Sequence, residues 1–193
     1  VEAAAVADRL DTEPLRWRAQ MLAGEAVRAS GEQFVPLAQQ TLDAVDVWLV
    51  RDSTKYLNWE LAGKHALELA GHAQMLGLEP KKWLEAALDY YEQAVTRYPS
   101  SIGLRAQLAA TLAIAARWAE AEKQWEIVDQ LDKATVHEDR RLANQQLWLP
   151  IAPCEADEDF KAEFAAEFAD GRPQIMAEPI LDWLRSHRPD QNN

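Results

Sequence analysis

The chain has 193 residues, 48% of them hydrophobic and 27% charged, a composition typical of a folded globular protein rather than a disordered one. Its net charge of −12 argues against nucleic acid as a partner, because binding a phosphate backbone needs clustered Lys and Arg. No run of 18 apolar residues occurs, so we expect no membrane insertion by this segment. The sequence begins with Val1, and we expect a processed chain or a piece of a longer one.

Apolar residues recur at helical spacing from the start of the chain. The first helix is predicted within residues 1–31, with Thr12 or Asp11 as its cap and Gly31 at its end. Its apolar positions are expected to be Leu15, Met21, Leu22 and Ala26, with Trp17 beside them. Further helices are predicted over residues 34–50, 56–75, 81–98, 102–116 and 118–132, separated by polar breaks.

The last third of the chain has a different pattern. A polar stretch over 135–141 leads into an extended apolar segment that Pro150 and Pro153 bracket. An acidic helix follows over 157–168, and a short helix over 174–187, whose first turn Pro179 is expected to end or kink. No stretch alternates with period two, so no strand is predicted.

Residues 83–99, WLEAALDYYEQAVTRYP, place small, aromatic and helix-ending residues in a fixed order. This order resembles the second helix of a tetratricopeptide (TPR) repeat, in which small residues let two helices approach and an aromatic ring fills the gap. The following helix pair resembles a whole repeat, although Arg105 and Lys133 depart from the usual residue types. The resemblance implies packing roles for Trp59, Gly63, Ala87, Tyr91, Ala94, Pro99, Leu108, Ala109, Leu112, Ala121 and Trp125.

The predicted fold is therefore all-α, a TPR-like right-handed superhelix of about three antiparallel helix pairs with a C-terminal helical cap. Repeats would occupy residues 1–133, and a linker with capping helices would occupy 134–193 of the same compact domain. The stripe of Phe160, Phe164 and Phe168 is interpreted as part of this cap. The eight tryptophans are interpreted as packing between helices. A plain helical bundle is the alternative architecture.

The function that this resemblance implies is protein–protein interaction, without catalysis and without a cofactor. A protein or peptide partner would bind the concave face that the first helices line. The exposed residues expected there are Arg18, Glu25, Glu60, Lys64 and Gln107. Their mixed charge indicates a polar peptide or a partner domain.

Two alternatives stay open. The segments RYPSS, ARWAEAE and TVHEDRRL resemble the soluble C-terminal tail of O-antigen ligase/polymerase-like membrane proteins. That resemblance implies an accessory tail tethered to a membrane domain upstream, where the glycan chemistry would lie. The second alternative is a structural role, in which aromatic faces drive self-association.

Candidate chemical sites are few. Cys154 lies among acids, which would raise its pKa and disfavour a nucleophilic role. His65 and His72 lie two helical turns apart, which is too far to share a metal ion. His137, in HEDRR, has no neighbouring nucleophile, and residues 157–159 do not continue into a calcium-binding loop. The sequence therefore predicts no catalytic or metal site.

Overall fold

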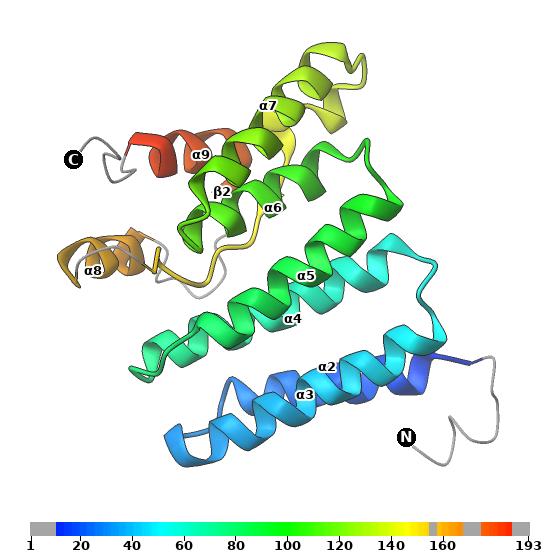
Figure 1. The fold of residues 1–193 in the computed structure, drawn as a ribbon, viewed down its shortest axis with the longest axis vertical. Helices are drawn as coiled ribbons and strands as arrows, with labels where there is room; N and C mark the ends of the chain where they lie inside the picture. Colours follow the sequence, from blue (N-terminus) through cyan, green and yellow to red (C-terminus); the bar gives the residue numbers. More distant parts are fainter. Residues whose placement is uncertain (1–10, 155–157, 168–174, 187–193) are drawn as a thin grey trace. The chain divides into compact units, whose positions relative to one another are not determined.

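A computed structural model describes residues 11–154, 158–167 and 175–186 (Figure 1). In these ranges the fold is all-α, and no described helix is long and apolar enough to cross a membrane. The chain divides into two compact units, Val1–Arg97 and Tyr98–Asn193. The unit boundary lies after residue 97, whereas the sequence changes character near 133/134.

Unit 1 contains the helices α2 (Glu13–Ala26), α3 (Gly31–Arg51), α4 (Tyr56–Met75) and α5 (Lys81–Arg97). They pair in chain order as two hairpins, α2–α3 and α4–α5, and α4 also contacts α2 and α3 (Figure 1). The bounds of α4 are those predicted, and α5 ends one residue early. The short connections therefore place each helix against the next one in the chain.

The first hairpin differs from expectation at three residues. The first helix ends at Ala26, and Gly31 begins α3 instead of ending the preceding segment. Pro36 lies inside α3, because Ser30 starts the helix one and a half turns before it. Met21 is 56% exposed and belongs to the outer surface of α2. The buried face consists of Leu15, Ala19, Ala23 and Ala26.

Aromatic contacts join the two hairpins of unit 1. The Phe34 ring on α3 lies 5.0 Å from Trp83 on α5 and 5.2 Å from His72 on α4, measured between ring centroids. His72 Nε2 lies 3.0 Å from the carbonyl oxygen of Ala29, just before α3. Phe34 is fully buried, so this contact is part of the core of the unit.

Unit 2 begins with a third hairpin, α6 (Ile102–Ile114) and α7 (Trp118–Ala134). Two 3₁₀ turns follow at Glu138–Arg140 and Leu142–Asn144, and then β1 (Gln146–Leu147), α8 (Glu158–Glu167), β2 (Ile175–Met176) and α9 (Ala177–Ser186). The prediction of no strands was wrong at one place, because β1 pairs antiparallel with β2 over two residues. A pairing this short leaves no periodicity to detect.

Residues 145–154 form an extended segment, here called the α6 strap, that runs along α6 in the same direction as the helix (Figure 1). The side chain of Gln145 lies against Gly103 near the start of α6. The backbone N–H of Cys154 donates to the carbonyl of Ile114 at its end, over 2.9 Å. The predicted extended segment around Pro150 and Pro153 is thus confirmed, and it covers one face of α6.

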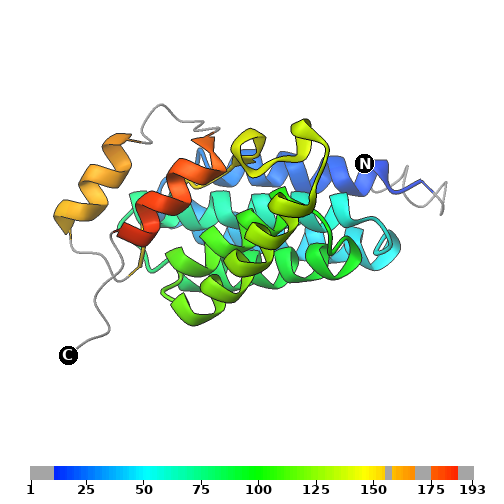
Figure 2. The same cartoon turned by 90° about the horizontal axis from the view of Figure 1, so that it is seen from above.

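The end of the described chain also packs within unit 2. Helices α8 and α9 lie beside each other (Figure 2). The Phe160 ring of α8 stacks on Trp183 of α9, with 5.1 Å between centroids. Phe164 is buried against the same ring, whereas Phe168 lies outside the described residues. Pro179 lies in the first turn of α9 without ending it, because the first turn of a helix needs no backbone donor there.

Candidate functional site

The outer surface of α2 carries exposed apolar side chains next to charged ones. Trp17 is 53% exposed, and Met21, one turn further along, is exposed to a similar extent. Arg18 and Glu25 are also exposed, as the sequence predicted, and their helical spacing places them beside Met21. The interpretation of every tryptophan as packing between helices was therefore wrong at Trp17. The buried face of α2 consists of Leu15 and three alanines, whereas the larger side chains of Trp17 and Met21 lie on the outer surface.

The predicted residues of α4, Glu60 and Lys64, are half-buried rather than fully exposed. Burial raises the pKa of the Glu60 carboxyl, and the nearby positive charge of Lys64 partly opposes this rise. One turn further, Glu68 Oε2 lies 3.4 Å from Nδ1 of the buried His65. The face of α4 thus presents alternating charges at spacings of four residues.

Gln107 is buried, which corrects the expectation that it is exposed on a binding face. Its amide group forms two hydrogen bonds with the backbone of the α6 strap. Nε2 donates to the carbonyl of Trp148, and Oε1 accepts from the Trp148 N–H, both over 2.8 Å. Gln107 therefore holds a segment of its own chain.

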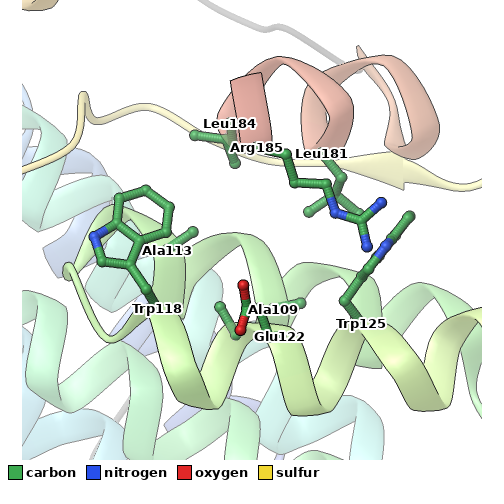
Figure 3. A pocket seen from close by; sticks show the side chains of 9 residues that line it. Ala109, Ala113, Trp118, Glu122, Trp125, Leu181, Leu184 and Arg185 are labelled. Carbon is green, nitrogen blue, oxygen red and sulfur yellow. The ribbon is translucent and has the colours of Figure 1, made fainter. Parts of the chain in front are cut away.

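A pocket of about 270 Å³ lies among α6, α7 and α9 in unit 2 (Figure 3). Alanines of α6 and α7 form its floor, two tryptophans of α7 stand at its two ends, and α9 covers it. Its lining residues are Ala109, Ala113, Trp118, Ala121, Glu122, Trp125, Leu181, Leu184 and Arg185. The sequence analysis missed this pocket, since three separate segments create it.

The predicted repeat-packing residues are mostly buried. Gly63 lies so close to Tyr91 that a Cβ at residue 63 would stand 2.8–2.9 Å from the tyrosine ring. Trp59 is half-buried, donates to the carbonyl of Ser53 and lies under the Arg97 guanidinium, and Pro99 is exposed in the turn after α5. The buried members are Gly63, Ala87, Tyr91, Ala94, Leu108, Ala109, Leu112, Ala121 and Trp125.

Titratable side chains do not converge on a chemical centre in the part of the chain that the structure describes. No group of three or more His, Cys, Asp or Glu residues that could hold a metal ion occurs there. His65 and His72 have separate surroundings, with His65 beside Glu68 and His72 beside Phe34. Cys154 is half-buried at the end of the α6 strap.

No protein-family model, no curated protein and no solved structure matches the chain. The resemblances to TPR repeats and to O-antigen ligase tails therefore stay predictions, carried by the residues and hairpins described above.

Proposed function

We propose that this protein is a non-catalytic protein–protein interaction module built from TPR-like helix hairpins. The observation that carries the proposal is the outer surface of α2, where Trp17 and Met21 are exposed beside Arg18. Trp, Met and Arg are the side chains most enriched where proteins bind each other. An exposed tryptophan buries a large apolar area when a partner covers it.

The charges of unit 1 supply specificity to this surface. Glu25 lies on the same helix, and the alternating charges of Glu60, Lys64 and Glu68 belong to α4, which contacts α2. Charged groups around an apolar centre select partners and raise association rates more than they add affinity. A partner with an apolar centre and mixed charge would therefore fit unit 1.

Affinity capture from source cells with the double variant Trp17→Ser/Met21→Ser tests the proposal. We expect the variant to lose the proteins that the unmodified chain captures while keeping its thermal stability, because exposed substitutions seldom change stability by more than about 0.5 kcal/mol. The matched control is Val47→Ser/Val50→Ser, which removes two exposed apolar side chains of α3. Capture that is equal for all three proteins would contradict the proposal.

Light scattering of the same proteins identifies one particular partner, a second copy of the chain. A mass that rises with concentration for the unmodified chain and not for Trp17→Ser/Met21→Ser would assign the α2 surface to self-association. A constant monomeric mass would leave a different protein as the partner.

A further inference from the structure

The α6/α7/α9 pocket lies within unit 2 and is separate from the α2 surface of the proposed function. Its volume of about 270 Å³ is near the lower end of the roughly 300–1,000 Å³ that ligand sites usually have. It is larger than the voids that close-packed interiors leave. The space therefore suits one large side chain rather than an extended ligand.

The lining makes the interior of this pocket apolar. Ala109, Ala113 and Ala121 leave room because their side chains are a single methyl group, and the Leu181 and Leu184 side chains of α9 close the opposite side (Figure 3). Trp118 and Trp125 lie two helical turns apart, about 10 Å along α7. An aliphatic or aromatic group in this pocket would contact the alanine, leucine and tryptophan side chains that line it.

At the edge of the pocket, the negatively charged side chains near Arg185 outnumber the positively charged ones. The Arg185 guanidinium lies 4.1 Å from the centre of the Trp125 ring, and its Nη1 lies 3.8 Å from a carboxylate oxygen of Asp182. Glu122 also lines the pocket, and Asp129 is close enough to act on the charge of Arg185. Burial lowers the pKa of Arg185, and these three carboxylates oppose that change.

This balance favours a cationic neighbour over an anionic one. Arg185 already faces Glu122, Asp129 and Asp182, and Asp129 is also paired with Lys133 over 2.8 Å, so an incoming carboxylate would meet three like charges beside two cations that are already paired. An incoming Lys or Arg would meet carboxylates that exceed the local positive charge. The net charge of −12 on the whole chain acts in the same direction.

We propose that the α6/α7/α9 pocket binds one large apolar side chain of a partner peptide whose neighbouring residues are Lys or Arg. The inference rests on the proposed interaction function and adds a second site with a defined partner chemistry. The pocket provides the apolar anchor position, and Glu122 and Asp182 face the basic residues on either side of the anchor.

Three capped five-residue peptides test this on the unmodified chain. The first has a central leucine flanked by two lysines on each side, the second replaces the leucine with alanine, and the third replaces the lysines with glutamates. Methyl NMR follows the pocket residues Ala109, Ala113, Leu181 and Leu184, with Ala38 and Val45 of unit 1 as reference signals.

The first peptide is expected to shift the pocket methyl signals and leave the reference signals unchanged. The alanine peptide should bind at least about tenfold more weakly, because it lacks three buried carbon atoms at about 0.8 kcal/mol each. The glutamate peptide should bind more weakly still, and added salt should reduce the affinity of the lysine peptide. Equal binding of the lysine and glutamate peptides, or no shift of pocket signals with any peptide, would overturn the inference.

Two variants localise the binding. Ala113→Leu fills the pocket and should abolish the methyl shifts of Leu184, and its thermal melt shows whether the fold is intact. Glu122→Lys/Asp182→Lys changes two exposed side chains and should weaken the lysine peptide by about threefold to tenfold, as expected for two surface charge pairs. Glu85→Lys on α5 is the control for charge and should have no effect.

The outcomes separate this inference from the function proposed above. The peptide titration reads the pocket without a native partner, so a negative result would overturn the inference and leave the capture experiment on Trp17 and Met21 unaffected. Peptide binding that persists in both variants would likewise overturn the pocket as the site. Equal capture by the unmodified chain and by Trp17→Ser/Met21→Ser, together with normal peptide binding, would contradict only the proposed role of the α2 surface.

Discussion

The α4–α5 and α6–α7 hairpins share one arrangement of residues but differ in how closely the helices pack at its central contact. Each places a small residue of the first helix opposite an aromatic residue of the second, Gly63 with Tyr91 and Ala109 with Trp125. In α4–α5 the tyrosine ring lies directly on the glycine backbone and the space is filled. In α6–α7 the two residues border an open pocket (Figure 3).

The difference comes from one methyl group and from the segment outside the hairpin. Glycine lets a ring approach the helix backbone, whereas the alanines of α6 carry a methyl group in that place, and α9 covers the remaining space. The first helices differ as well, since α4 keeps half-buried charges on its surface and α6 is covered by its strap. Similar hairpins can thus yield a filled core in one unit and an open pocket in the other.

The largest expected effect concerns the α6 strap. Gln107→Ala removes the side-chain partner of the partly buried Trp148 N–H and carbonyl, and we expect a loss of about 2–3 kcal/mol from the free energy of unfolding, as for two lost hydrogen bonds. Urea unfolding measures this loss, and hydrogen exchange at the Trp148 amide shows whether the strap opens. The exposed Gln130→Ala on α7 is the control. A change below about 1 kcal/mol would mean that other contacts hold the strap.

A matched pair of substitutions tests the central contact of the two hairpins. Gly63→Val places new carbon atoms against the Tyr91 ring and should destabilise the protein by about 2 kcal/mol through overpacking. Ala109→Val adds atoms toward the open pocket and should cost less than about 1 kcal/mol. Both values come from thermal or urea unfolding. Similar costs for the two substitutions would show that the pocket does not accommodate added volume.

The smallest effects concern the turns that end α4 and α6. Both end in the same hydrogen-bonded motif, with Gly77 at φ 70° in one and Ala116 at φ 59° in the other. A side chain in the left-handed region is strained, so Ala116→Gly should stabilise the protein by about 0.5–1 kcal/mol and Gly77→Ala should destabilise it by about 1 kcal/mol. Opposite shifts of the melting temperature are the expected result. Shifts of the same sign would contradict this account of the turns.

The sequence predicted the helices best where its breaks were sharp. The bounds of α4 agree with the prediction because the polar residues before Tyr56 and the Gly77 turn leave little freedom. Gly31 was misread because glycine can stand near either end of a helix, and Ser30 precedes it as the cap residue. Met21 and Trp17 were wrongly predicted to pack inside. The buried face of α2 is mostly alanine, and the sequence pattern favours the larger apolar side chains as the buried ones.

The candidate sites were harder to predict than the helices. The sequence identified Arg18 and Glu25 as exposed, and the resemblance to TPR repeats implied packing roles for Gly63 and Tyr91, which the structure places in close contact. It could not show that Gln107 is buried, because its partner, Trp148, is 41 residues away and presents only its backbone. Local periodicity contains no information about such a partner.

The sequence by itself determined that the chain is helical and where most helices begin and end, because these features depend on neighbours a few residues apart. Only the tertiary structure decided that the strap covers α6 and that α9 covers the space beside Trp118 and Trp125. Both arrangements join segments distant in the chain, and their stability comes from burying apolar side chains, such as Leu147 of the strap and Leu184 of α9. Burial of this kind depends on which surfaces meet, and the local pattern of residues does not specify that.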